Sequence, residues 1–398
     1  SFDDWGNRFV CSNSNHIQHV LLEHRYLSRH PGLPPPSSIR TIAAAGAAAP
    51  VFRRSSAEPW RVVRTRRRVS DPKTKARLPR TEQFAVGFFT SATGVTIYTG
   101  NAYPAAFHGN AFIGDVGGNL IHRKTMEASG ASFIARRADQ KVEFITSSDN
   151  WFRPTNFVNG PDGTLYVLDM YRETIEHPYS IPEDIKQHLD LNSGDTRGRV
   201  YRLQPAGWKP PTRTRLRQAS TAHLVTLLDS DNGWHRQTAQ RLLWERRDPA
   251  AIVSLARLAR EASTPLDRVH AMYTLDGLGA LPTSLLVASL KDRSAHVREH
   301  AVRLGESRLD SPDLSRTLPD LLQDRSPRVL HQLAFSLGES SADWSLKLLQ
   351  GLALHHDNDA HLRLAVMTAS RGRETQLLAV VCGIHHEVRR PLLFHAQK

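Results

Sequence analysis

The sequence predicts a multidomain β plus α protein in which a β-rich part precedes an α-rich part. Up to about residue 205, Gly, Asn, Asp and aromatic residues separate short runs of strand-forming residues. Beyond that point, Leu, Ala, Arg and His recur at helical spacing. Between the two parts lies the stretch 204–211 (QPAGWKPP), whose prolines disfavour regular structure. We therefore expect a linker over residues 206–218.

Two similar stretches predict the architecture of the first part. The stretches 111–122 (AFIGDVGGNLIH) and 156–167 (NFVNGPDGTLYV) each contain a strand, a tight glycine-containing turn and a second strand. Phe112 and Phe157 are 45 residues apart, which is close to the length of one four-stranded propeller blade. We predict a partial β-propeller over 1–205, with a basic insertion at about 31–83. A closed ring needs more blades, so we expect missing blades or a partner to complete it.

A repeat of about 32 residues predicts the architecture of the second part. The stretch 292–301 (DRSAHVREHA) resembles 324–333 (DRSPRVLHQL), and weaker copies lie at 234–243, 266–275 and 361–368. Amphipathic helices that recur at this period stack as helix pairs, each burying one face on its neighbour. The sequence therefore predicts HEAT-like helical repeats, an α-solenoid, over 219–371. The segment 372–398 matches no pattern and stays unassigned.

Composition excludes several classes of protein. The chain has 398 residues and a formal net charge of +13, and residues 53–80 hold 11 Arg and Lys against 2 acidic residues. We interpret this basic segment as a solvated arm or as a stretch that packs on an acidic partner. Nucleic-acid binding is disfavoured, because Phe52 and Trp60 are too few aromatic residues to stack on bases. No apolar run of about 18 residues predicts a membrane span. Two cysteines without CxxC or CxxCH predict no metal site and no haem.

Several motifs carry a resemblance to a known family. They are DWGNRF (4–9), EPWRVVR (58–64), DNWFRP (149–154), PDGTLYVLDMYRE (161–173), IEHP (175–178) and GRVYR (198–202). Together they resemble the planctomycete proteins classed as membrane-bound dehydrogenases, which combine a glucose/sorbosone-dehydrogenase-like β-propeller, HEAT repeats and a c-type cytochrome domain. The resemblance covers residues 1–205 by motif and 220–370 by architecture alone.

The resemblance implies a function. It suggests a fragment of an exported, periplasmic or secreted, quinone- or cytochrome-linked carbohydrate dehydrogenase, with pyrroloquinoline quinone as cofactor. The implied partners are a sugar or alcohol substrate and a c-type cytochrome domain or protein. Because the haem-attachment motif is absent here, no haem is expected in this chain. The rival interpretation is a non-catalytic scaffold that binds protein or polysaccharide, so whether the chain is an enzyme stays open.

The densest polar cluster follows the predicted strand 165–168 and supplies the candidate catalytic residues, Asp169, Glu173 and His177. If residues 171–177 form a helical turn, Glu173 faces His177 and Arg172 faces Glu176. A carboxylate beside His177 would raise the pKa of its imidazole and fix its tautomer, as a general base requires. The alternative is an ion-paired turn that locks two blades together.

Three arginines are candidates for binding the cofactor. Arg153, Arg172 and Arg199 could hold a quinone carboxylate, because a guanidinium binds carboxylates with two parallel hydrogen bonds. The alternative for Arg153 is packing at the rim of a blade. The stretch 190–195 (DLNSGD) carries oxygen ligands reminiscent of a calcium loop, although the spacing of an EF-hand and its final Glu are missing.

Overall fold

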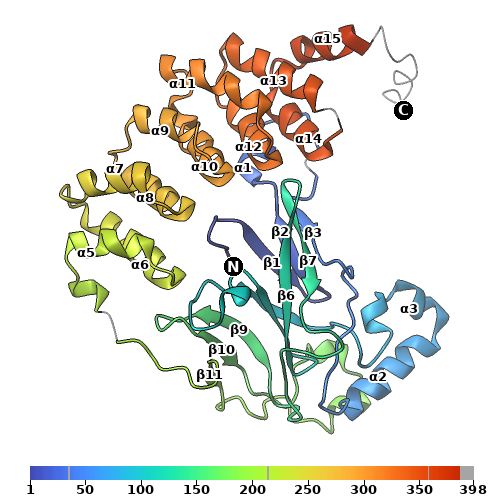
Figure 1. The fold of residues 1–398 in the computed structure, drawn as a ribbon. Coiled ribbons are helices and arrows are strands. Elements are labelled where there is room, and N and C mark those ends of the chain that lie inside the picture. Colours follow the sequence, from blue (N-terminus) through green and yellow to red (C-terminus); the bar gives the residue numbers. More distant parts are fainter. Residues whose placement is uncertain (35, 213–214, 357, 386–398) are drawn as a thin grey trace. The chain divides into compact units, whose positions relative to one another are not determined.

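The computed structural model describes residues 1–34, 36–212, 215–356 and 358–385, and it contains both sheets and helices, as predicted (Figure 1). The chain divides into two compact units. The first, here called the β unit, comprises Ser1–Leu21, Ile39–Arg215 and Ser230–Gln237. The second, the helical unit, comprises Leu22–Ser38, Leu216–Asp229 and Thr238–Lys398. Residues 386–398 of the unassigned C-terminal segment lie outside the described residues.

The β unit contains three antiparallel sheets. One has the order β1-β2-β3 and another the order β11-β10-β9, while the largest runs β4-β5-β6-β7 and has β8 paired to β6. The strands are β1 (Arg8–Ser12), β2 (Asn15–Val20), β3 (Ile39–Thr41), β4 (Ala92–Ile97), β5 (Ala111–Asp115), β6 (Leu120–Ser129), β7 (Ser132–Arg137), β8 (Ile145–Thr146), β9 (Pro154–Asn159), β10 (Leu165–Asp169) and β11 (Arg199–Leu203).

The two similar stretches of sequence are hairpins, as their turn residues predict. In the first, β5 pairs with β6 and the strands close at Asp115 opposite Leu120. In the second, β9 pairs with β10 and the turn contains Gly163 at φ +79°, a conformation that glycine adopts without steric cost. Asp162 fixes that turn, because its Oδ1 accepts the backbone N–H of Thr164 at 3.1 Å.

Two groups of buried apolar side chains make the core of the β unit. The larger one joins the sheet of β1 and β2 to that of β4, β5 and β6, and it includes Phe9, Ile17, Phe89, Ile113 and Leu120. The smaller one packs the inner face of β9 and β10 against Phe112 and Ile121. These cores fix the strand ends, and therefore the loops that carry the candidate residues.

The basic insertion forms helices that pack within the β unit. Helix α2 (Pro59–Ser70) buries Trp60, Arg61 and Arg64, and α3 (Pro72–Arg77) follows with Asp71 as its N-cap. Arg64 pairs with Glu176, and Arg67 pairs with Asp184 at 2.7 Å. The segment is therefore not a solvated arm, and the acidic residues beside it come from the same chain. The remaining short helices of this unit are η1 (Arg80–Glu82), η2 (Ala105–Phe107), η3 (Pro178–Ser180) and α4 (Glu183–Lys186).

The helical unit consists of helices in two adjoining rows. In one row α8, α10, α12 and α14 pack in succession, and in the other α5, α7, α9 and α11 do so. The helices are α1 (His24–Leu27), α5 (Thr221–Thr226), α6 (Gly233–Arg246), α7 (Ala251–Glu261), α8 (Pro265–Gly277), α9 (Thr283–Ser289), α10 (Ala295–Leu304), α11 (Pro312–Thr317), α12 (Pro327–Leu337), α13 (Asp343–His355), α14 (Ala360–Ala369) and α15 (Glu374–His385), with η4 (Leu216–Gln218), η5 (Leu227–Asp229), η6 (Glu306–Arg308) and η7 (Leu318–Gln323) between them.

A repeated ion pair joins successive helices of the first row. Arg268 of α8 donates from Nε and Nη2 to Asp292, with both distances 2.8 Å. Arg298 of α10 binds Asp324 in the same way at 2.6 and 2.9 Å. Each aspartate also accepts a backbone N–H just before the next helix, from Ser294 or Ser326. The repeated Asp-Arg-Ser sequence thus places one aspartate per repeat between two helices.

Replacing Arg298 by methionine should lower the stability of the helical unit by about 2 kcal/mol, because Asp324 would keep its charge in a site where it is 3% exposed. Circular dichroism at 222 nm during thermal unfolding would measure the loss. Lys291→Met is the matched control, since Lys291 and its partner Asp320 are both largely exposed and such a pair contributes under about 1 kcal/mol. Equal melting temperatures for the two variants would contradict the structural role of the buried pair.

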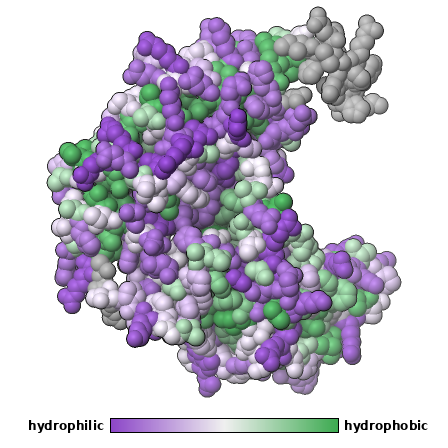
Figure 2. Space-filling model, in the orientation of Figure 1, coloured by the Kyte–Doolittle hydropathy of each residue, from purple (hydrophilic) through white to green (hydrophobic). Residues whose placement is uncertain are grey.

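The surface is mixed in polarity. Figure 2 shows hydrophilic residues over most of the face in view, with hydrophobic residues interspersed among them. Within the described part of the chain, no helix combines the length and the apolar character needed to cross a bilayer.

Candidate functional site

The loop after β10, which carries the predicted catalytic residues, is not helical. Residues 171–177 form no helix, and the first helical element beyond them is η3. Glu176 turns to Arg64 of α2 rather than to Arg172, and the backbone N–H of Glu173 donates to the carbonyl of Ser193 at 3.3 Å. Because these residues form no helical turn, the predicted facing of Arg172 with Glu176 and of Glu173 with His177 was wrong.

His177 lies at the surface. Its Nδ1 accepts the backbone N–H of Tyr179 at 3.4 Å, and its ring stacks on the Tyr179 ring at 5.3 Å. The side chain of Glu173 is also exposed, and its backbone carbonyl accepts a hydrogen bond from Arg153. The structure therefore places His177 and Glu173 on one loop without bringing their side chains together, and a catalytic role for them stays a prediction.

Asp169, at the end of β10, is buried. Its Oδ1 accepts the backbone N–H groups of Arg153 at 2.7 Å and Tyr171 at 2.9 Å. Its Oδ2 is also buried and has no hydrogen-bond partner among the described residues. Tyr171 takes φ +49°, which is unusual for an aromatic residue and costs conformational energy. Asp169 thus fixes a strained backbone where the strand ends.

Arg153 is the centre of this region. It is fully buried, and all three of its guanidinium nitrogens donate to groups of the protein. Nε donates to the carbonyl of Arg172 at 2.9 Å, Nη1 to that of Val116 at 2.8 Å, and Nη2 to Glu58 Oε1 at 2.6 Å. Burial lowers the pKa of the guanidinium, and the carboxylate of Glu58 opposes that effect. This placement does not fit the predicted clamp on a quinone carboxylate.

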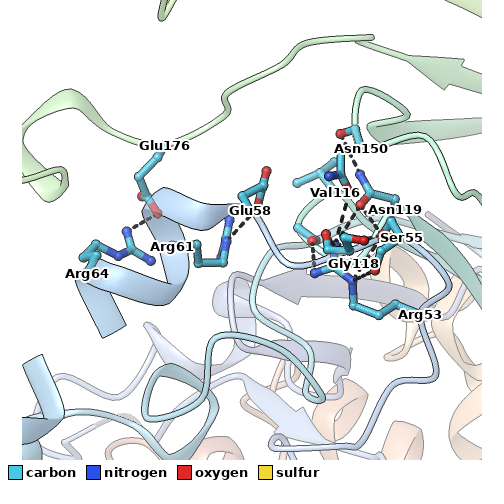
Figure 3. A network of polar contacts seen from close by, with 12 residues as sticks. Arg53, Ser55, Glu58, Arg61, Arg64, Val116, Gly118, Asn119, Asn150 and Glu176 are labelled. Atoms are coloured by element: carbon cyan, nitrogen blue, oxygen red, sulfur yellow. Dashed lines mark hydrogen bonds and ion pairs between the residues drawn. The ribbon is translucent and has the colours of Figure 1, made fainter. Parts of the chain in front are cut away.

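Glu58 links Arg153 to helix α2, a connection that the sequence analysis missed. Its Oε2 accepts from Nε of Arg61 at 3.0 Å, next to the pair of Arg64 with Glu176 (Figure 3). The buried carboxylate therefore lies between two guanidinium groups, Arg61 and Arg153. In the sequence, Glu58 stands out only through the EPWRVVR motif. That motif indicated the family resemblance and did not predict a contact between Glu58 and Arg153.

A second missed group surrounds Asn119 in the β5–β6 turn. Ser55 donates to Asn119 Oδ1 at 2.7 Å, and Arg53 donates to the same oxygen at 3.3 Å (Figure 3). The amide nitrogen of Asn119 donates to the carbonyls of Asn150 at 2.9 Å and Phe152 at 2.8 Å. The basic insertion is thus tied to the turn and to the segment before β9.

The other two predicted arginines lie at the edge of this network. Arg172 donates from Nη2 to the carbonyl of Leu191 at 2.6 Å. Arg199 is exposed, with its guanidinium carbon 3.3 Å from the centre of the Tyr171 ring and its Nη1 3.1 Å from the hydroxyl of Tyr201. In the stretch 190–195, Asp190 accepts the backbone N–H of Asn192 and shapes a turn. Calcium binding there stays a prediction.

A cluster of buried ionisable residues lies in the larger core of the β unit. His16 stacks on Phe89 at 4.4 Å, and both of its ring nitrogens are buried. His122 contacts Glu143 through Nδ1 at 2.6 Å. Burial lowers the pKa of both histidines well below the usual range, and burial and Arg137 lower the pKa of Lys124 to about 8. Over the residues that the structure describes, no three His, Cys, Asp or Glu side chains lie together as a metal ion would require.

The helical unit includes residues 22–34 and 36–38, a segment that we call the strap. Its helix α1 presents Tyr26, which is 1% exposed and whose ring lies parallel to that of Phe335 at 4.5 Å. The Tyr26 hydroxyl donates to Glu306 Oε1 at 2.5 Å and accepts from Gln332 Nε2 at 2.9 Å. Arg25 donates from Nη1 to Glu306 Oε2 at 2.7 Å. Tyr26 therefore contacts Phe335 and Gln332 of α12, and Arg25 forms an ion pair with Glu306 of η6.

Arg29 of the strap binds at the end of α12. Its Nη1 donates to the carbonyl of Phe335 and to Glu339 Oε1, both at 2.8 Å, and its Nε donates to the carbonyl of Thr368 at 3.1 Å. Its guanidinium lies directly over Gly338. At the two ends of this contact, Glu23 pairs with Arg303 and His30 with Glu374, each at 2.8 Å. We call the receiving residues the strap seat; they are Arg303, Glu306, Gln332, Phe335, Gly338, Glu339, Thr368 and Glu374.

The fold and these contacts define a protein with mixed sheet and helix structure in two units, one of which includes the strap. Residues 1–207 match the family described as Domain of unknown function (DUF7133), and the chain belongs to that family. A search of curated proteins gave no match.

Two solved structures are similar to part of the chain. One is an engineered protein from the Northeast Structural Genomics Consortium, which is 18% identical, covers 41% of this chain and 88% of its own, and has a TM-score of 0.29. The other is a designed armadillo repeat protein in complex with the peptide (KR)4, which is 18% identical, covers 43% of this chain and 94% of its own, and has a TM-score of 0.30. At these TM-scores the two likenesses carry no functional conclusion.

Proposed function

We propose that this chain is a non-catalytic binding scaffold related to the membrane-bound dehydrogenases of planctomycetes. In this proposal the three sheets are blades of a partial β-propeller, and the two rows of helices are a HEAT-like α-solenoid. The blades would be radial sheets of antiparallel strands, which agrees with the strand orders of the β unit. The solenoid would stack helix pairs through nearest-neighbour contacts, which agrees with the two rows and the repeated Arg–Asp pair.

One observation carries the scaffold proposal over the enzyme proposal. Arg153, one of the three candidates for holding a quinone, is fully buried, and its guanidinium nitrogens bond to Glu58 and to backbone carbonyls. Asp169 orders the backbone of the same loop. These two residues perform structural work in the β unit, and His177 has an aromatic neighbour rather than a carboxylate. In this proposal Arg153 and Asp169 stabilise the fold of the β unit and do not bind a substrate or a cofactor.

The experiment that tests the scaffold proposal is a dye-linked sugar oxidation assay on the intact chain, supplied with pyrroloquinoline quinone and calcium. We expect no dye reduction above the protein-free control and no change of the quinone absorbance on titration. Sugar-dependent dye reduction that is lost in a His177→Ala variant would overturn the proposal, because His177 is exposed and its replacement should leave the fold intact.

A specific observation favours the dehydrogenase as a second candidate. Tyr171 is held at φ +49° beside a buried carboxylate oxygen of Asp169 for which the described chain offers no partner, and the exposed Arg199 lies over its ring. Strained backbone and unsatisfied polar atoms gather at functional sites. In this second proposal the chain is part of an exported or periplasmic enzyme, with a carbohydrate substrate and a c-type cytochrome partner. A positive result in the same assay would favour it.

A further inference from the structure

We propose that the strap seat is a peptide-docking site for a partner segment with the pattern arginine–tyrosine–two residues–arginine. The strap, through Arg25, Tyr26 and Arg29, is then an internal competitor that occupies the site. This inference rests on the proposed scaffold function and names the class of its partner. It concerns the helical unit alone, because the strap and its seat both belong to that unit.

The seat has the chemistry of a cation receptor. Glu306 and Glu339 supply carboxylates, and the carbonyl of Phe335 lies in the last turn of α12. The C-terminal end of a helix carries partial negative charge, so it favours a guanidinium. Thr368 adds a carbonyl from α14, and the arginine therefore bonds to two successive helices of the same row. Lysine could not reproduce these contacts, because the planar guanidinium donates in several fixed directions.

The position between the two arginines selects an aromatic residue with a hydroxyl. The Tyr26 ring stacks on Phe335 with an interplanar angle of 9°, and the Arg25 guanidinium lies 4.0 Å above the same ring. The hydroxyl bonds to Glu306 and Gln332, which are both largely buried. A phenylalanine would keep the stacking and leave these buried polar groups without their partner, which is unfavourable. The seat thus distinguishes tyrosine from phenylalanine.

Gly338 makes room for the second arginine. A Cβ at this position would lie 2.5 Å from the guanidinium carbon of Arg29 and 2.7 Å from its Nη1. The backbone of Gly338 is in the ordinary helical region, with φ −73°, so it does not need glycine for its conformation. The three atoms nearest to such a Cβ all belong to the guanidinium of Arg29. A substitution at Gly338 can therefore block the seat without straining the helices that form it.

The strap is suited to exchange. Over its described residues it has one helix, α1, of 4 residues, and three of its apolar side chains are buried, those of Leu22, Tyr26 and Leu27. A segment joined to its site has an effective concentration on the order of 1 mM, so a partner must overcome that advantage or find the strap released. The intact chain should consequently bind an external segment much more weakly than a chain whose strap is disabled.

The test uses the full chain with three substitutions in the strap, Arg25→Ala, Tyr26→Ala and Arg29→Ala. A fluorescent peptide that copies residues 22–38 is titrated with this variant, and its anisotropy is measured. We expect saturable binding that is at least 100-fold tighter than binding to the unchanged chain. A peptide with Tyr26→Phe or Arg29→Lys should bind at least tenfold more weakly than the original peptide.

Matched glycine variants locate the site. In the strap-disabled chain, Gly338→Ala should weaken peptide binding at least tenfold. Gly383→Ala should leave it unchanged, because a Cβ at that position in α15 meets no atom within 4 Å. A folded strap-disabled chain that does not bind the peptide, or that binds it equally well with Gly338→Ala, would overturn the proposal.

A second measurement covers the case in which the strap-disabled chain does not fold. Gly338→Ala alone, in the otherwise unchanged chain, should release the strap and increase the rate of tryptic cleavage after Arg25 and Arg29 at least tenfold. An unchanged cleavage pattern would also overturn the proposal. The sugar oxidation assay has a separate readout, so failure of the docking site and failure of the scaffold proposal are distinguishable.

Discussion

Replacing Arg153 by methionine should destabilise the β unit by about 3 to 5 kcal/mol. Arg153 is the donor for three backbone carbonyls and one oxygen of Glu58, and a buried acceptor that loses its donor costs about 1 to 3 kcal/mol. Glu58 would keep only its bond to Arg61, and the carbonyls of Val116 and Arg172 would each lose a buried donor. Hydrogen–deuterium exchange in increasing urea, measured on peptides from β9 and β10, would give the change in the free energy of unfolding for this unit.

The matched control for that experiment is Arg199→Met. Arg199 is exposed, and its contacts with Tyr171 and Tyr201 are at the surface, so its loss should leave the stability of the β unit essentially unchanged. A single Arg153→Met variant as stable as the unchanged chain would contradict the structural role assigned to Arg153.

Replacing Lys124 by methionine should stabilise the β unit at pH 7 by about 3 kcal/mol. The side chain is 1% exposed and its backbone pairs directly with Arg137 of the adjacent strand. Burial and that neighbouring charge lower the pKa of Lys124 from 10.5 to about 8. A tenfold change in the acid dissociation constant corresponds to about 1.4 kcal/mol, so this lowering accounts for the expected gain. Methionine has a similar length and no charge to bury.

The gain from Lys124→Met should depend on pH. The folded protein loses the Lys124 proton near pH 8 and the unfolded chain near pH 10.5, so the unchanged protein gains stability as pH rises between those values. The advantage of the variant is therefore full below pH 8 and disappears toward pH 10.5. The other ionisable groups facing this site are His16, His122 and Glu143. Urea unfolding at pH 7 and pH 10 measures the difference, and Lys141→Met, at an exposed lysine, is the control. A variant less stable than the unchanged chain at pH 7 would refute the prediction.

Local sequence patterns predicted the elements of this fold more fully than their contacts. The hairpins at Asp115 and Gly163 follow from turn chemistry, and the helices follow from apolar spacing together with the repeated Asp-Arg-Ser sequence. These features depend on residues within a few positions of one another. The path of the strap depends on contacts between Tyr26 and Phe335, which are more than three hundred residues apart, and no local pattern encodes such a pairing.

The candidate site was predicted in composition and not in geometry. Asp169 and Arg153 do lie together, because β9 and β10 are neighbours. The helical turn failed because Glu176 has a stronger partner in Arg64, on a helix that the sequence suggested to be a solvated arm. Arg153 has a structural role because it is buried. Which of several arginines becomes buried depends on the tertiary fold, so it could not be predicted from one sequence.

The close approach at Gly338 has a consequence for related sequences. Arg29 lies inside the region that matches the family, whereas Gly338 lies beyond it. Because a methyl group at 338 and a guanidinium at 29 cannot occupy the same space, the two positions should covary. Relatives that carry any residue larger than glycine at position 338 should have replaced the arginine at position 29. Such paired changes would be visible in aligned genomes without a protein being purified.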